Sequence, residues 1–139
     1  MLMRGLDDKL VLNWNGIMEI GLTYTSTLVV SKDHVAAVMG SGDLHVFATP
    51  AMVALMENAA MLAVANHLPE GSTTVGAMMN TSHVKPSPVE ETIRATAVLT
   101  AIEGRKLTFS VKAEDSKGII GEAVHVRYVV DKEKFMSKL

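Results

Sequence analysis

The feature that most constrains the fold is a stretch of fifteen residues, 51–65, in which only Glu57 and Asn58 are not apolar. A helix with apolar side chains on nearly every side cannot lie on the surface, so a sheet must wrap it or a second subunit must share it. Fifteen residues rise about 23 Å along a helix, which is less than the roughly 30 Å of hydrocarbon in a bilayer. The stretch therefore predicts a buried core helix and not a membrane span.

The sequence also marks where this helix begins and ends. Thr49 is a suitable N-cap, and Pro50 suits the first helical position. The segment 67–71, His-Leu-Pro-Glu-Gly, contains the proline and the glycine that stop a helix. We expect a helix over residues 49–68.

Most of the remaining chain has the pattern of β-strands, rich in β-branched residues and alternating between two faces. The predicted strands cover residues 18–31, 73–84, 92–103, 105–115 and 119–130. Short turn sequences connect the last three strands, which predicts an antiparallel meander. One strand, one apolar helix and four antiparallel strands make an α+β fold. A curved antiparallel sheet wrapped around one long central helix is the layout of the hot-dog fold, and such domains usually dimerise.

The chain of 139 residues shows no internal repeat and no low-complexity linker, which indicates one domain. We assign residues 18–139 to this domain and residues 1–17 to an N-terminal extension. Residues 33–46 contain the turn sequence Gly-Ser-Gly-Asp and are expected to form a loop. The prolines in the segment 85–88 exclude it from a central strand.

Composition excludes several classes of function. Cysteine is absent, which excludes disulfide scaffolds, thiolate zinc sites and cysteine nucleophiles. The 13 Lys and Arg residues are balanced by 15 Asp and Glu residues, so we expect no nucleic-acid partner. The five histidines form no metal-binding helix motif, and no Gly-x-Ser-x-Gly elbow is present. We therefore expect no metal site and no serine-hydrolase triad.

Three polar residues are candidates for chemistry. Glu57 interrupts the apolar helix, where a buried carboxylate needs a partner or a proton. His83 ends a predicted strand, and histidine is the side chain that most readily carries a proton near neutral pH. Thr49 lies eight residues before Glu57, about 12 Å along the helix, so their side chains cannot touch within one chain. Thr49 and Glu57 either border one long groove or meet across a dimer interface, and the sequence is consistent with both arrangements.

Four pieces of the sequence together resemble the fluoroacetyl-CoA thioesterase family of hot-dog proteins, over roughly residues 18–136. They are residues 46–57, 76–83, 103–107, and 125–127 with 133–135. The resemblance implies that Thr49, Glu57 and His83 form the catalytic set. It further implies that Gly76 donates its backbone N–H to the thioester carbonyl and that Arg127 lies near the coenzyme A arm.

By this resemblance the chain is expected to be an acyl-CoA thioesterase for short or medium acyl chains. Coenzyme A enters only as part of the substrate, and no other cofactor is implied. We expect a cytoplasmic homodimer, with pairing of dimers into a tetramer left open. The loop before Val46 lacks the phenylalanines that form a lid over the acyl group in the fluoroacetyl-specific enzyme. The resemblance therefore does not predict fluoroacetyl selectivity.

Two alternatives remain beside thioester hydrolysis. A hot-dog enoyl-CoA hydratase needs an aspartate paired with its histidine, and the sequence after the 73–84 strand offers none that matches. A non-catalytic acyl-CoA-binding protein would keep the groove without turnover. Release of free coenzyme A from a panel of acyl-CoAs separates hydrolysis from binding alone.

Overall fold

The computed structural model of the protein describes residues 10–13 and 16–139. The elements in chain order are β1 (Leu10–Asn13), β2 (Gly16–Glu19), β3 (Thr23–Val29), the 3-10 turn η1 (Lys32–His34), α1 (Ala36–Met39), α2 (Thr49–Val64), the 3-10 turn η2 (Ala65–His67), β4 (Ser72–His83), β5 (Thr92–Glu103), β6 (Lys106–Asp115), β7 (Gly118–Asp131) and α3 (Lys132–Ser137). Helix α2 and strands β4 to β7 match the predicted elements to within a few residues.

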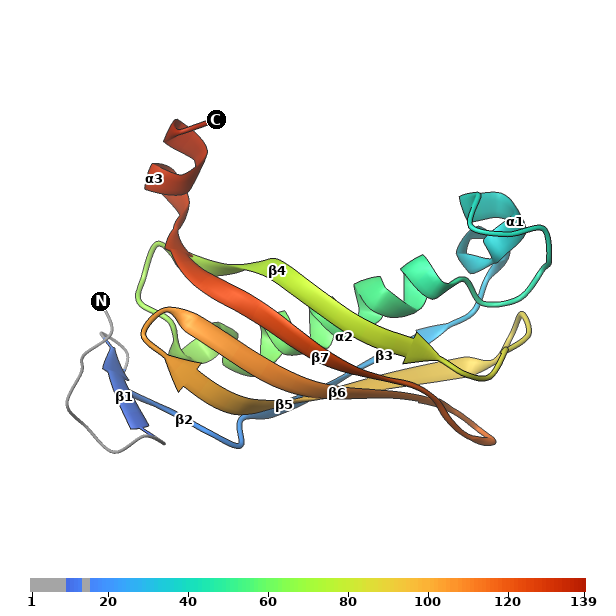
Figure 1. Ribbon diagram of the computed structural model, residues 1–139, viewed down its shortest axis with the longest axis horizontal. Helices are drawn as coiled ribbons and strands as arrows, with labels where there is room; N and C mark the ends of the chain where they lie inside the picture. The colour runs from blue at the N-terminus through green and yellow to red at the C-terminus, as the bar shows by residue number, and fades with distance from the viewer. Residues whose placement is uncertain (1–9, 14–15) are drawn as a thin grey trace.

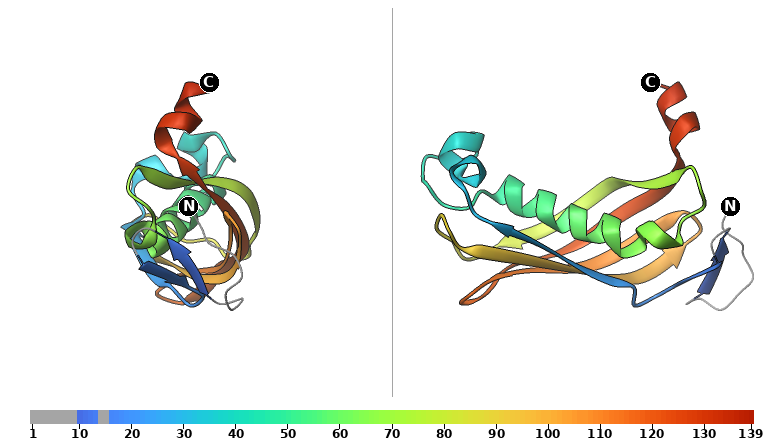
Figure 2. Two further views of the ribbon diagram at one scale, coloured as in Figure 1. Left: turned by 90° about the vertical axis from the view of Figure 1, so that its left-hand side faces the viewer. Right: turned by 180° about the vertical axis from the view of Figure 1, so that it is seen from behind.

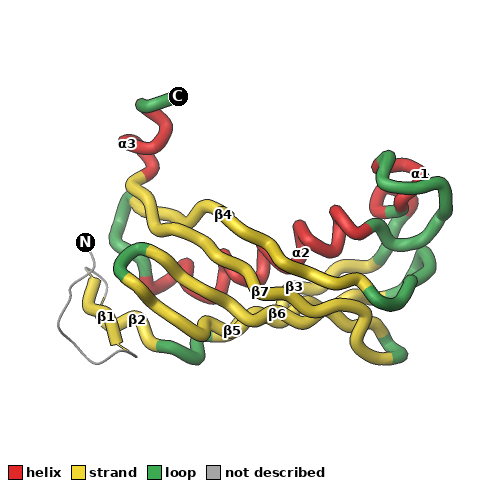
Figure 3. Tube along the Cα trace, in the orientation of Figure 1, coloured by secondary structure: helices red, strands yellow, loops and turns green. Residues whose placement is uncertain are grey.

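One antiparallel sheet with the strand order β3-β5-β6-β7-β4 forms the body of the domain. Strands β5, β6 and β7 make the predicted meander, and β4 pairs with the far side of β7. The sheet curves along the length of α2, which lies on its concave face (Figures 1 and 2). The α+β hot-dog layout is confirmed. A separate pair, β1 with β2, lies at the end of the domain away from α1 (Figure 3).

The strand predicted over residues 18–31 is interrupted. Strand β2 ends at Glu19, and β3 begins at Thr23. Gly21 between them has a φ of +105°, a conformation that glycine adopts without the penalty that a Cβ imposes. Its N–H donates to the carbonyl of Leu99 at 2.8 Å, which ties the break to β5.

The boundary predicted at residue 18 falls within β2. Met18 is fully buried in the core. The hairpin of β1 and β2 begins before this boundary, at Leu10. Residues 1–9 and 14–15 of the predicted extension lie outside the described residues.

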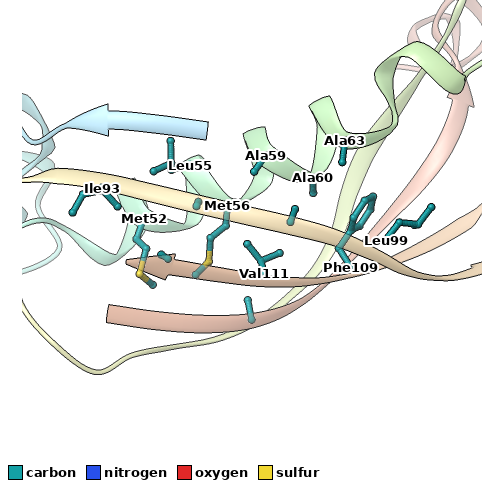
Figure 4. Close-up of a cluster of buried hydrophobic side chains, with 14 of the residues drawn as sticks. Met52, Leu55, Met56, Ala59, Ala60, Ala63, Ile93, Leu99, Phe109 and Val111 are labelled. Carbon is teal, nitrogen blue, oxygen red and sulfur yellow. The ribbon is translucent and has the colours of Figure 1, made fainter. Parts of the chain in front are cut away.

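Helix α2 supplies the centre of the core through one broad face. Its buried residues are Ala51, Met52, Leu55, Met56, Ala59, Ala60, Ala63 and Val64. They belong to one hydrophobic cluster with Ile93, Leu99, Phe109 and Val111 of the sheet, and Figure 4 shows Met52 and Met56 pointing from the helix toward these strands. The small alanines let the helix lie close to the strands, and the large methionines fill the space between them.

The opposite face of α2 is open in a single chain. Ala54 and Asn58 are exposed there, and Val53, Glu57 and Met61 are only partly buried. In one chain the sheet covers only one side of the helix, and cover of the other side by a second subunit stays a prediction. In the part of the chain that the structure describes, no helix is long and apolar enough to cross a membrane.

Gly121 on strand β7 packs tightly against Met52 of α2. A Cβ built on Gly121 would lie 2.8 Å from Met52 Sδ and 2.5 Å from the backbone carbonyl oxygen of Ser82. The Met52 side chain can bend away. The Ser82 carbonyl belongs to the paired strand β4, so moving it would distort the backbone of the sheet.

We predict that Gly121→Ala lowers the free energy of unfolding by about 1–3 kcal/mol, because the added methyl group overpacks the core. Urea denaturation followed by circular dichroism measures the change. The neighbouring exposed residue supplies the control, Glu122→Ala, which is expected to stay within about 0.5 kcal/mol of the parent. Equal stability of Gly121→Ala and the parent would contradict the close packing.

Candidate active site

Thr49 and His83 form one polar pair at the N-terminal end of α2. Thr49 Oγ1 lies 2.8 Å from His83 Nδ1 and joins the first turn of the helix to the last residue of β4. Thr49 itself is the first helical residue, and the N-cap is Ala48, which makes no side-chain cap bond. The prediction that Thr49 is the N-cap is wrong by one position, and its hydroxyl bonds to the imidazole instead.

His83 lines a pocket of about 270 Å³. The other walls come from the loop around α1, the segment Val46 to Thr49, and the residues from Val84 to Pro86. The ring of Phe47 stands edge-on to the imidazole, with 6.3 Å between the ring centroids. The Nε2 atom of His83 is buried and has no hydrogen-bond partner among the described residues. It is the ring nitrogen left available for a further proton transfer.

Burial lowers the pKa of His83 below its usual value of 6.5, because a charged ring loses hydration. A backbone hydrogen bond with Lys85 opposes this shift without cancelling it. The imidazole is therefore neutral at pH 7. A neutral ring can accept a proton, as a general base or proton shuttle must.

Glu57 belongs to a second polar group, near the middle of α2. Its Oε2 atom lies 3.6 Å from Arg127 Nη1 on β7, and 42 % of its side chain is exposed. The carboxylate is therefore half-buried in a single chain and is paired with Arg127. A Cβ built on Gly76 would lie 2.5 Å from the same Oε2 atom. Glycine at this position therefore lets the carboxylate reach the sheet.

The sheet is irregular beside Glu57. Gly76 is paired with Arg127, Met78 is paired with Val126, and Ala77 between them is bulged out. A bulge takes a residue out of the ladder and re-aims the neighbouring groups. The backbone of β4 next to the carboxylate is thus not in regular pairing.

The two groups are separate within one chain. The structure brings Thr49 to His83, and it brings Glu57 to Gly76 and Arg127. Thr49 and Glu57 are eight positions apart in α2, about 12 Å along the axis. The predicted site residues therefore form two half-sites.

Sequence reasoning missed two residues that hold Arg127. Arg127 Nε donates to Thr74 Oγ1 at 2.8 Å, and its Nη1 lies 3.2 Å from His125 Nε2. Thr74 and His125 are both buried. His125 and Arg127 are two residues apart, so they share one face of β7, which was the available signal. The contact with Thr74 depends on the pairing of β4 with β7, which the sequence did not specify.

Among the described residues, no group of three or more His, Asp or Glu side chains is arranged to hold a metal ion. The polar groups of the two half-sites are a carboxylate, a neutral imidazole, a hydroxyl and an irregular strand backbone. These are the groups that acyl transfer to water uses.

The fold and this set of groups define a hot-dog thioesterase, and comparison with known proteins agrees. The family model of the fluoroacetyl-CoA-specific thioesterase matches residues 30–133. A fluoroacetyl-CoA thioesterase from Streptantibioticus cattleyicolor is 39 % identical over 94 residues, which is 68 % of each chain. The chain belongs to the fluoroacetyl-CoA-specific thioesterase family.

Solved structures of similar proteins show the same fold. A crystal structure of the fluoroacetyl-CoA-specific thioesterase FlK superimposes with a TM-score of 0.81 at 33 % identity, covering 87 % of this chain and 94 % of that one. A hot-dog-like protein from Thermanaerovibrio acidaminovorans superimposes with a TM-score of 0.78 at 21 % identity, covering 86 % and 88 % of the two chains.

We predict that His83 and His125 both titrate below pH 6.5, because burial is the largest influence on each pKa and lowers both. These rings bind protons more weakly in the folded chain than in the unfolded chain. The free energy of unfolding is therefore expected to fall as the pH drops below about 6.5. Nitrogen-15 NMR of the imidazole rings across pH 4.5–8 gives the midpoints. A midpoint at or above 6.5 for either ring would contradict the described burial.

Proposed function

We propose that the protein hydrolyses a short- or medium-chain acyl-CoA thioester to the free acid and coenzyme A. The observation that supports this most is the hydrogen bond between Thr49 and His83 at the mouth of a pocket, in a chain whose only charged residue within α2 is Glu57. Coenzyme A is part of the substrate, and the residues described here supply every other group that the reaction needs.

In the proposed reaction a water molecule attacks the thioester carbonyl carbon while Glu57 accepts its proton. An alternative route is direct attack by Glu57, which gives a mixed anhydride that water then hydrolyses. The backbone N–H of Gly76, beside the bulge in β4, stabilises the negative charge that develops on the carbonyl oxygen. The C–S bond breaks, and the departing thiolate receives a proton by way of His83.

Thr49 orients His83 in this scheme. Its hydroxyl is 2.8 Å from Nδ1, which leaves Nε2 as the nitrogen that exchanges protons with the reacting groups. The hydroxyl can either donate or accept at Nδ1, so it supports the ring in both of its neutral forms.

We further propose that a complete site needs two copies of the chain. The half-site of Thr49 and His83 is about 12 Å along the helix from Glu57, too far for both to act on one carbonyl carbon. In a dimer with twofold symmetry, antiparallel α2 helices bring Glu57 of one subunit toward Thr49 and His83 of the other.

Two features of the surface support such a dimer. The open face of α2 presents Val53, Ala54 and Met61 beside Glu57, so apolar area there remains to be covered. Among residues 10–13 and 16–139, strand β4 pairs only with β7, so no described strand covers its outer edge. Its twelve residues include no Lys, Asp, Glu or Pro, which are the residues that usually protect an edge from pairing.

The pocket is small, and Val46 and Phe47 supply apolar walls, which fits a short or medium acyl chain. Because coenzyme A esters are intracellular, we infer a cytoplasmic location. Recovery of the native protein from a membrane or periplasmic fraction would contradict this.

We predict that Glu57→Ala and His83→Ala each lower kcat/KM by roughly 10²–10⁴-fold, because each removes a group that moves a proton. The assay measures release of free coenzyme A from a panel of acyl-CoAs with a thiol reagent. Turnover within a few-fold of the parent in both variants would overturn the assignment.

Glu70→Ala is the matched control, because this exposed carboxylate lies beyond the end of α2 and outside both half-sites. It is expected to keep the activity of the parent. Tight binding of the panel without release of coenzyme A by the parent protein would instead favour a non-catalytic binder.

A further inference from the structure

Two ionisable side chains lie on the inner face of β7, in an otherwise apolar part of the core. His125 is 1 % exposed and Arg127 is 6 % exposed. Their neighbours on this face, Ala123 and Val129, are buried and apolar. Burying a guanidinium is costly unless its donors are paired, and apolar residues of similar size would stabilise the fold at least as well. Stability of the core alone therefore does not explain why His125 and Arg127 are buried here.

The partners of His125 specify its protonation state. Its Nδ1 atom lies 2.8 Å from the carbonyl oxygen of Met78, and its Nε2 atom lies 3.2 Å from Arg127 Nη1. A carbonyl only accepts a hydrogen bond, and a guanidinium only donates. The ring therefore carries its proton on Nδ1 and accepts at Nε2, which assigns one neutral tautomer.

Arg127 is held at three of its nitrogen atoms. Nε donates to Thr74 Oγ1 at 2.8 Å, and Nη2 donates to the Thr74 carbonyl oxygen at 2.9 Å. Nη1 is held by His125 and faces Glu57 Oε2 at 3.6 Å. Thr74 fixes one side of the guanidinium plane, and His125 fixes the end that faces the carboxylate.

We propose that His125 is a positioning residue for thioester hydrolysis, whose Nε2 atom holds the guanidinium of Arg127 in place against the Glu57 carboxylate. The inference rests on the proposed role of Glu57. A guanidinium fixed beside Glu57 restricts the rotation of the carboxylate and holds it in one orientation, which a base or nucleophile requires. It also gives Arg127 a role at the carboxylate, in addition to the place near the coenzyme A arm that the resemblance implies.

Protonation of His125 would remove this support, because a charged ring has no free acceptor for Arg127. Burial, the largest influence, lowers the pKa of His125, and the charge of Arg127 lowers it further. The hydrogen bond to Met78 and the charge of Glu57 oppose the shift without cancelling it. The ring thus stays neutral and able to accept at neutral pH.

The test uses two substitutions in the full-length protein. His125→Leu fills the space beside Phe109 and removes the acceptor, so it separates packing from positioning. We expect kcat to fall about tenfold or more with KM changed by less than about threefold. His125→Gln keeps an acceptor and is expected to return kcat to within about threefold of the parent.

Ser26→Ala is the matched control. Ser26 is buried on β3 and donates to Asn58, the residue after Glu57, at 2.7 Å. Removing this bond disturbs the same helix without touching Arg127, so kcat is expected to stay within about threefold of the parent. An equal loss of kcat in Ser26→Ala would show a general effect on the helix and would overturn the proposal.

Nitrogen-15 NMR of the parent protein tests the geometry independently of activity and of whether His125→Leu folds. It is expected to show His125 protonated on Nδ1 and unprotonated on Nε2 at pH 7 to 8; the opposite tautomer would overturn the proposal. If Glu57→Ala retains turnover, the proposed function itself fails. If Glu57→Ala is inactive but His125→Leu matches the parent in kcat, only this inference fails.

Discussion

The packing of α2 on the concave face of the sheet is the interaction on which the rest of the structure depends. Eight residues of the helix are buried against the strands, and the close approach at Gly121 leaves no room for a side chain there. A helix so apolar needs cover on its remaining side as well, which the single sheet does not supply. Both the curvature of the sheet and the proposed dimer follow from this one requirement.

The same packing determines which polar residues need partners. In a core made almost entirely of apolar side chains, each buried or half-buried polar group must find a partner. The partners that the structure supplies divide these groups into two half-sites, Thr49 with His83 and Glu57 with Arg127. Hydrolysis of a thioester needs both a proton shuttle and a base. We therefore propose that each complete site combines one half-site from each of two subunits.

The sequence allowed most of the fold to be predicted, because the period of apolar residues identifies α2 and the strands independently of their neighbours. It did not reveal the break at Gly21, which depends on a bond to β5. The role of the Thr49 hydroxyl was also misjudged, because capping is local whereas the bond to His83 joins residues 34 positions apart. The support of Arg127 by Thr74 and His125 needed the strand register, which periodicity leaves open.

The central claim is that Glu57 of one subunit acts with Thr49 and His83 of the other. Mixing inactive Glu57→Ala and His83→Ala chains, with exchange of subunits, tests it most directly. In a mixed dimer one site carries both substitutions and the other carries neither, so random exchange is expected to restore about a quarter of the parent activity. If the mixture stays as inactive as its components while mixed dimers are shown to form, each site is built within one chain and the account is wrong.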